Sequence, residues 1–143
     1  MSNDRTGDVA QKLGLGVETL RYYERIGLVS SPSRTSTGRR LYSDEDIKRL
    51  AFVKRARELE FSLDEIRQLL ELSVPENFSC EKIQSIASAA LERSRARLLA
   101  LQYAERALAA AIEQCPTASG ECCPILDRLS NDAQYSVPKA ATA

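Results

Sequence analysis

Residues 6–29, TGDVAQKLGLGVETLRYYERIGLV, hold two short helical patterns with a glycine turn between them. The first pattern places Val9, Ala10 and Leu13 on one face of a helix, and the second starts at Val17 after the turn GLG. In a helix-turn-helix unit of this form, the second helix enters the major groove of DNA. An ordinary helical hairpin with its tyrosine pair half in the core explains the spacing equally well.

The second helix would present a polar and aromatic surface to a partner. Its outward residues are Glu18, Thr19, Arg21, Tyr22 and Tyr23. Arginine and threonine supply hydrogen-bond donors for base edges and phosphates, and the tyrosine rings add flat aromatic surface. These residue types therefore suit a nucleic-acid contact.

The next segment, VSSPSRTSTGRRLYS at residues 29–43, combines turn-forming residues with three arginines, Arg34, Arg39 and Arg40. Its RRLY run at residues 39–42 predicts a short strand. The segment is therefore expected to form a basic hairpin, or wing. A wing beside a recognition helix supplies phosphate contacts, which position a protein on DNA without reading its sequence.

Two further helices are predicted between residues 43 and 72. Ser43 caps the pattern DEDIKRLAFVKRARELE, whose acidic first turn suits the positive end of a helix dipole. Ser62 caps the shorter pattern that follows. This second helical pair would pack on the first pair and brace the wing.

Residues 5–72 as a whole resemble the winged-helix DNA-binding head of the MerR family of transcriptional regulators. The R-Y-Y-E run and the R-x-Y after the wing glycine carry the resemblance. It implies that DNA is contacted by Arg21, Tyr22, Tyr23, Arg39 and Tyr42, with Arg34 and Lys54 as further candidates. An enzyme is disfavoured, because the sequence has no histidine, no glycine-rich phosphate loop and no recognisable pair of catalytic carboxylates.

Composition and charge agree with a small DNA-binding head attached to a second element. The 143 residues suffice for one compact domain, or for a small domain with an extended element. The formal charge is zero, yet residues 1–56 carry eleven Lys and Arg against seven Asp and Glu, and residues 57–143 carry nine against thirteen. A basic N-terminal half is typical of a segment that binds a polyanion.

The second half is predicted to contain one long helix over residues 81–114, preceded by a linker at residues 73–80. The helical segment has neither glycine nor proline and is rich in strong helix formers. Two heptad positions, one with Leu91, Leu98, Glu105 and Ile112 and the other with Ala87, Ser94, Leu101 and Leu108, form a seam that is apolar at six of eight sites. The chain has no other helix of this length, so the seam is expected to pair with a second copy.

The four cysteines suggest how two copies would pair. Cys80 and Cys115 are five heptads apart on the seam phase, about 50 Å along a helix, and cannot share an ion within one chain. In an antiparallel dimer, Cys80 of one subunit meets the loop of the other, where a turn brings Cys122 or Cys123 toward Cys115. The expected function of residues 115–130, loop and short helix, is metal binding. A redox-sensing or electrophile-sensing thiol cluster and a purely structural role are the alternatives.

The resemblance extends to this half, which is similar to the metal-responsive branch of the family. By position, Cys80, Cys115 and Cys123 match the three ligands of the mercury sensors, and Cys122 lies where cadmium sensors place their last ligand. Thiolates without imidazole select soft metals, and three of them suit a divalent ion. Mercury(II) ranks first, then cadmium(II) and lead(II), then zinc(II). A monovalent copper or gold sensor is an alternative, and so is a metal carrier that does not bind DNA.

The resemblance also implies a mechanism. Such regulators bind a promoter with or without metal and distort its DNA when metal arrives, so that RNA polymerase engages it and a metal-resistance promoter is activated. The fold class is therefore mainly α, with a winged helix-turn-helix head, an antiparallel coiled-coil dimerisation helix and a C-terminal metal loop. We expect a cytoplasmic protein, because no leader or membrane-spanning segment is evident. Residues 131–143 are expected to be disordered.

Overall fold

The computed structural model describes residues 4–115 and 123–130 of the chain. It divides into two units, Met1–Ala90 and Leu91–Ala143, and each is treated by itself. Cys122 and the predicted disordered tail lie outside the described residues. Among those described, no helix has the length and apolar character needed to cross a membrane.

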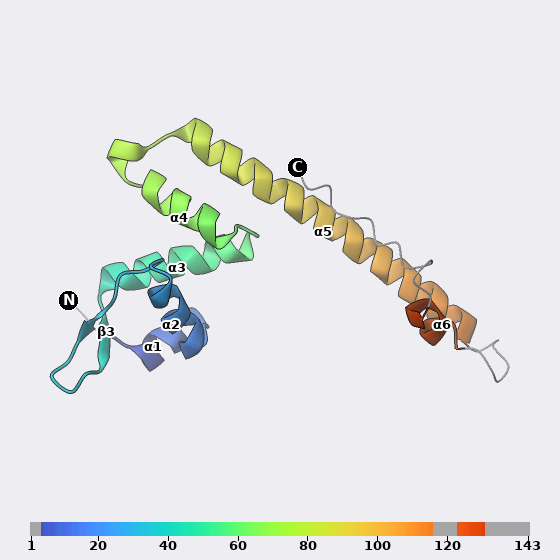
Figure 1. Cartoon of the computed structure of the whole chain (residues 1–143), viewed down its shortest axis with the longest axis horizontal. Helices are drawn as coiled ribbons and strands as arrows, with labels where there is room; N and C mark the ends of the chain where they lie inside the picture. Colours follow the sequence, from blue (N-terminus) through green and yellow to red (C-terminus); the bar gives the residue numbers. More distant parts are fainter. Residues whose placement is uncertain (1–3, 116–122, 131–143) are drawn as a thin grey trace. The chain divides into compact units, whose positions relative to one another are not determined.

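The first unit is built mainly from short helices packed beside a small sheet (Figure 1). The helices are α1 (Thr6–Leu13), α2 (Val17–Arg25), α3 (Asp44–Glu58) and α4 (Leu63–Leu72), and the strands are β1 (Asp4–Arg5), β2 (Ser33–Arg34) and β3 (Arg40–Tyr42). The structure thus confirms the predicted winged helix-turn-helix with its second helical pair.

Local capping rules fix the helix ends. Ser43 and Ser62 each form a capping box, the first with Asp46 and the second with Glu65. At the other end, α1, α2 and α3 finish in the same pair of backbone hydrogen bonds around a residue with positive φ. That residue is Gly14 after α1 and Gly27 after α2, but Glu60, with φ 66°, after α3.

The wing is built on β3, the central strand of a three-stranded antiparallel sheet in the order β1-β3-β2. Arg34 of β2 faces Arg40, and Arg5 of β1 faces Leu41. Sequence analysis did not predict β1, since a two-residue strand is too short to show an alternating pattern.

The core of this unit lies where the helices meet β3. Its buried members are Val9, Ala10, Leu20, Tyr23, Leu28, Val29, Tyr42, Leu50, Val53, Ala56, Ile66 and Leu70. Two arginines tie the second helical pair to the residues that end α2. Arg67 donates to the carbonyl of Ile26 at 2.8 Å, and Arg49 donates to the carbonyl of Leu28 at 2.9 Å. The Ile26 carbonyl is at the C-cap of α2 and the Leu28 carbonyl lies just beyond it, so neither has a partner within the helix.

A one-turn 3-10 helix, η1 (Pro75–Asn77), connects α4 to the long helix α5 (Cys80–Gln114). Ser79 precedes α5, and its hydroxyl accepts from the backbone N–H of Lys82. Cys80 is therefore the first residue of the helix, not the last residue of the linker as predicted. A short helix, α6 (Pro124–Ser130), follows in the second unit at the predicted position.

Candidate nucleic-acid interface and metal-ligating cysteines

The helix α2 has one face in the core and one on the surface. Leu20 and Tyr23 lie in the core, with 0% and 7% of their surface exposed, whereas Tyr22 is 40% exposed. The Arg25 guanidinium lies over the Tyr22 ring, 5.5 Å from its centroid. This cation–π contact fixes the exposed ring on the surface of the helix.

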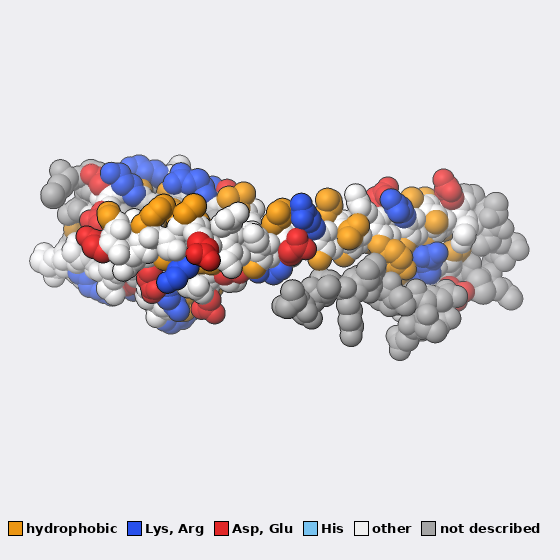
Figure 2. Space-filling model, turned by 90° about the horizontal axis from the view of Figure 1, so that it is seen from above, with side chains coloured by type: hydrophobic (Ala, Val, Ile, Leu, Met, Phe, Trp, Pro, Cys, Tyr) orange, Lys and Arg blue, Asp and Glu red, His pale blue; other side chains and the backbone are white. Residues whose placement is uncertain are grey.

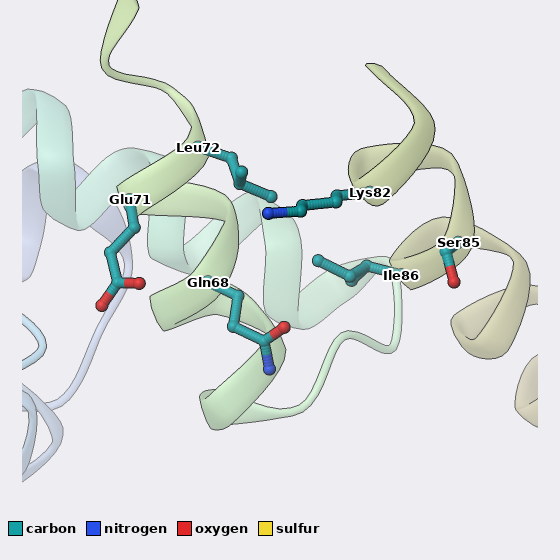
Figure 3. Close-up of a pocket in the computed structure, with 6 residues that line it drawn as sticks. All are labelled: Gln68, Glu71, Leu72, Lys82, Ser85 and Ile86. Atoms are coloured by element: carbon teal, nitrogen blue, oxygen red, sulfur yellow. The ribbon is translucent and has the colours of Figure 1, made fainter. Parts of the chain in front are cut away.

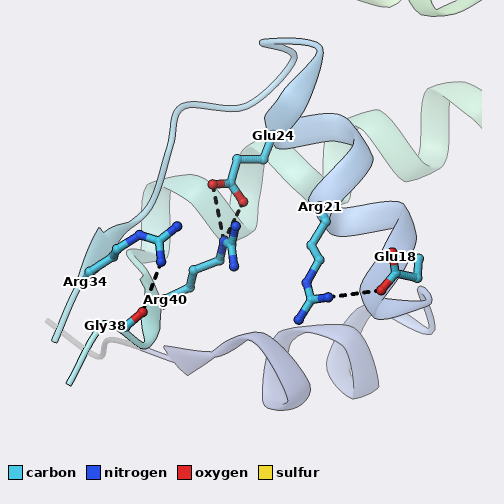
Figure 4. A network of polar contacts seen from close by, with 6 residues as sticks. All are labelled: Glu18, Arg21, Glu24, Arg34, Gly38 and Arg40. Carbon is cyan, nitrogen blue, oxygen red and sulfur yellow. Dashed lines mark hydrogen bonds and ion pairs between the residues drawn. The ribbon is translucent and has the colours of Figure 1, made fainter.

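Arg21 is exposed on the same helix and its Nη1 donates to Glu18 Oε1 at 3.1 Å (Figure 4). Thr19 is half-buried beside it. A hollow of about 420 Å³ adjoins this surface, lined by Thr19, Tyr22, Arg25 and Arg57 among others. The surface therefore offers guanidinium donors and an aromatic face, which suit phosphate oxygens and base edges.

The wing places its basic side chains in solvent on a preformed turn. Arg34 and Arg39 are exposed. The turn is closed by hydrogen bonds from the Gly38 N–H to the Thr35 carbonyl at 2.9 Å and from Arg34 Nη1 to the Gly38 carbonyl at 3.1 Å. Because the turn is hydrogen-bonded before any ligand arrives, its arginines lose less conformational freedom on binding phosphate.

Two tyrosines lie deeper than the sequence predicted. Tyr42 is 0% exposed, and its hydroxyl is buried with no hydrogen-bond partner of good geometry among the described residues. Burial raises the pKa of Tyr42, and the nearby Thr6 side chain acts in the opposite direction. Tyr23 is buried but lines the hollow beside Tyr22, whereas Tyr42 is fully enclosed. The expected DNA contact of Tyr42 is therefore not supported by its position, since a strand with period-two alternation carries it into the core.

Lys54 lies on α3, where it is half-buried and pairs with Glu58 at 3.2 Å. Two contacts in this region were not predicted from the sequence: Arg25 with Tyr22, and Arg40 with Glu24. Arg25 follows Tyr22 by three residues, and this helical spacing could have indicated the first contact. The second joins residues sixteen positions apart, and no local sequence rule predicts such a pair.

The three described cysteines are free thiols, and they do not form a metal site within the described residues of one chain. Cys80 and Cys115 are exposed and Cys123 is half-buried. No group of three potential ligands comes together in residues 4–115 and 123–130. Cys80 begins α5 and Cys115 follows its last residue, so the helix holds these two thiols about 50 Å apart. A site that used both Cys80 and Cys115 would therefore need thiols from two chains.

The joint between the head and α5 is sparsely packed. Val74 and Phe78, on either side of η1, are 44% and 66% exposed. A groove of about 310 Å³ separates α4 from the first turns of α5, with Leu72 on one side and Lys82 and Ile86 on the other (Figure 3). Few buried contacts hold this joint, so its geometry can change at low cost.

The helix α5 leaves large apolar side chains in solvent, as the heptad pattern predicts. They are Leu91, Leu98, Leu99, Leu101, Leu108 and Ile112, each at least half exposed. Figure 2 shows hydrophobic side chains along this helix. All but Leu99 belong to the two predicted seam positions. Such a continuous apolar stripe on a single helix marks an interaction surface.

Comparison with known proteins places the chain in a family. A model described as "MerR HTH family regulatory protein" matches residues 5–73, and one described as "MerR, DNA binding" matches residues 47–111. The mercuric resistance operon regulatory protein of Bacillus cereus is 37% identical over 126 residues, which cover 87% of this chain and 96% of that protein. The chain belongs to the MerR family. It is thus a DNA-binding transcription regulator and not an enzyme.

Other relatives of this MerR-family chain carry related names. The HTH-type transcriptional regulator ZntR of Escherichia coli K12 is 35% identical over 132 residues, 90% of this chain and 94% of that protein. The transcription regulator PbrR691 of Ralstonia metallidurans CH34, solved in complex with lead(II), is 32% identical, with a TM-score of 0.65 over 88% of this chain and 98% of that chain. These relatives place the chain among the metal-responsive regulators of the family, and their names differ in the metal.

Proposed function

We propose that this protein is a metal-responsive regulator that binds promoter DNA as an antiparallel homodimer and senses a soft divalent ion at cysteine sites shared between subunits. The observation that carries the proposal is the placement of the thiols on α5. Cys80 opens the helix, Cys115 follows it, and both are exposed. Each end of the helix thus holds part of a ligand set.

The exposed seam supports pairing with a second copy. Leu98 and Leu101, near the middle of α5, are 56% and 60% exposed, and burying the exposed part in a partner's seam is favourable by about 1 kcal/mol each. Pairing in opposite directions brings the first residue of one α5 to the last residue of the other. A parallel pair would instead place the two Cys80 thiols together, away from Cys115 and Cys123.

The chemistry of the donors supports a soft ion. Cys80, Cys115 and Cys123 are thiols, and the chain has no histidine to supply imidazole. Thiolates bind soft metals well and magnesium or calcium poorly. We rank mercury(II) first, as the name of the Bacillus cereus relative suggests, and cadmium(II) and lead(II) next. Zinc(II) follows, since its usual tetrahedron needs a fourth ligand.

The position of Cys80 supports a coupling to DNA. Cys80 is two residues beyond Phe78 in the sparsely packed joint. A metal ion bound at Cys80 would therefore change the conformation of the segment that connects the head to α5. Two heads on one dimer contact two half-sites, and a change at the joints would strain the DNA between them. Bending or untwisting the DNA between two half-sites costs several kcal/mol. We propose that the distorted promoter is then engaged by RNA polymerase.

A metal titration tests the sensing step. The reduced dimer is titrated with mercury(II), cadmium(II), lead(II), zinc(II) and copper(I) in the presence of thiol competitors. The variants are Cys80→Ser and, as a matched control, Ala87→Ser, which introduces the same hydroxyl at a seam position of α5. We expect one divalent ion to bind most tightly and to lose at least tenfold in affinity in Cys80→Ser only.

Other outcomes of the titration would assign a different function to the protein. If copper(I) bound most tightly and Cys80→Ser had no effect, the protein would be a monovalent-ion sensor that uses the C-terminal loop alone. If no ion bound and mild oxidant modified the thiols, it would be a redox or electrophile sensor. The DNA step fails if the tightest ion leaves the chemical reactivity of the promoter's central base pairs unchanged while transcription rises.

A further inference from the structure

The recognition helix and the wing are joined by an ion pair between Glu24 and Arg40. Arg40 Nε donates to both carboxylate oxygens of Glu24, at 2.9 and 3.3 Å (Figure 4). Only 11% of the Glu24 side chain and 26% of the Arg40 side chain are exposed. Within residues 4–115, we find no other ion pair between α2 and the wing.

The residues around this ion pair hold it in place. Arg40 and Tyr42 lie on the same face of β3, because side chains two residues apart in a strand point the same way. The Tyr42 side chain is buried in the core, and the charges of Glu24 and Arg40 both act on its hydroxyl. The core therefore holds the base of the wing strand, and the ion pair holds the next outward residue of the same face.

The rest of the wing follows β3 as a unit. Arg34 is paired with Arg40 across the β2–β3 ladder. Thr35 makes two hydrogen bonds to Arg39 across the turn, since its N–H donates to the Arg39 carbonyl at 2.8 Å and its hydroxyl accepts from the Arg39 N–H at 3.0 Å. A rotation of β3 against α2 would therefore carry Arg34 and Arg39 with it.

We propose that Glu24 and Arg40 are positioning residues, whose ion pair sets the distance between the wing and the recognition helix so that Arg34, Arg39 and Arg21 reach DNA together. This inference rests on the proposed DNA binding. It adds that the Glu24 carboxylate, on the recognition helix itself, holds the spacing between the DNA contacts of the wing and those of the helix. Arg40 contributes through Glu24 and not as a further phosphate contact.

The substitution Glu24→Gln distinguishes a phosphate-contacting role of Arg40 from a positioning role, because the two roles predict opposite changes in affinity for the specific site. In Glu24→Gln, the head loses a negative charge. If Arg40 simply contacted a phosphate, removing its competing carboxylate would tighten binding to every DNA sequence. If the pair positions the wing, the same substitution weakens binding to the specific site and leaves non-specific binding unchanged or slightly tighter, because phosphate attraction alone does not require the correct spacing.

The experiment uses a duplex that the wild-type dimer selects from a random-sequence pool, with a scrambled duplex as the non-specific probe. Glu45→Gln is the charge-matched control, since Glu45 is exposed on α3. For Glu24→Gln we expect about a tenfold loss on the selected duplex only. Ethylation interference should lose the wing's phosphates and keep those of α2, and the wing amides of Thr35 and Gly38 should exchange hydrogen faster without DNA.

A reversed pair, Glu24→Arg with Arg40→Glu, keeps the wild-type net charge and should regain most of the lost affinity. The inference is overturned if Glu24→Gln binds the selected duplex as tightly as Glu45→Gln does, or if the reversed pair shows no recovery while circular dichroism shows it folded. A wild-type dimer that selects no duplex would overturn the proposed DNA binding itself.

Discussion

At the scale of single residues, Tyr42 carries a hydroxyl in the core without a hydrogen-bond partner among the described residues. A buried polar group without a partner costs about 1–3 kcal/mol. We therefore expect Tyr42→Phe to raise the free energy of unfolding by about 1 kcal/mol, measured by urea denaturation, and to leave DNA affinity unchanged. Tyr22→Phe, which removes an exposed hydroxyl from α2, is the control. A loss of DNA affinity in Tyr42→Phe would restore Tyr42 to the interface.

The tyrosines also show how far sequence alone specifies such a site. The helical spacing of α2 placed Arg21 outside correctly, because the pattern is local. It placed Tyr23 outside, although the ring is buried. A tyrosine is amphipathic, so the direction of its side chain depends on the neighbours that the fold supplies.

Glu60 occupies a backbone position that favours glycine. Its φ is 66°, and a residue with a Cβ pays about 1–2 kcal/mol in this region. Gly14 and Gly27 hold the equivalent positions after α1 and α2, and a Cβ at either would meet no atom within 4 Å. We expect Glu60→Gly to stabilise the protein by about 1 kcal/mol and Gly14→Ala to destabilise it by a similar amount, in urea denaturation. Destabilisation by Glu60→Gly would mean that the Glu60 side-chain interactions outweigh the strain.

At the scale of elements, the capping box of α3 makes stability depend on acid pH. Burial acts to raise the pKa of Asp46, but hydrogen bonds from the backbone and hydroxyl of Ser43, at 2.9 and 2.8 Å, outweigh it and hold this pKa below its usual 3.8. A depressed carboxyl pKa stabilises the fold above the unfolded pKa, and this contribution is lost as pH falls through the folded pKa.

The substitution Asp46→Asn tests this contribution. We expect it to lower the free energy of unfolding by about 1 kcal/mol at pH 7, and the difference from wild type to shrink below about pH 3.8. Glu45→Gln removes a charge from the same helical turn without touching the cap, so comparing the two variants isolates the box. A difference that stays constant down to pH 2 would contradict the role of the Asp46 carboxylate.

The elements differ in how well sequence predicts them. Both serine caps and α5 follow from residues within a few positions of each other, and the structure confirms them. The strand β1 and the pair of Glu24 with Arg40 depend on segments brought together by the fold. Local sequence patterns do not predict contacts between distant segments, so these contacts could be found only in the structure.

At the scale of the whole molecule, the metal site depends on an assembly that one chain cannot show. The heptad count predicted that Cys80 and Cys115 are too far apart to share an ion. In the structure one continuous helix, α5, runs from Cys80 to Gln114, and its rise separates its two ends by about 50 Å. The thiol donors and their spacing along the chain can be read from the sequence. The approach of Cys80 to the other thiols requires a second subunit and stays a prediction.

A mixed dimer gives the decisive test of that prediction. Cys80→Ser and Cys115→Ser chains with different tags are co-expressed, and the dimer carrying both tags is isolated. If sites are shared, this dimer keeps one complete site, because one chain supplies Cys80 and the other supplies Cys115 and Cys123. We expect half the metal capacity of the wild-type dimer at wild-type affinity, measured by competition with a thiol chelator, and no tight binding in either homodimeric variant. If each chain instead bound its own ion through the C-terminal loop alone, the Cys80→Ser homodimer would keep the full metal capacity at wild-type affinity, and this result would contradict shared sites.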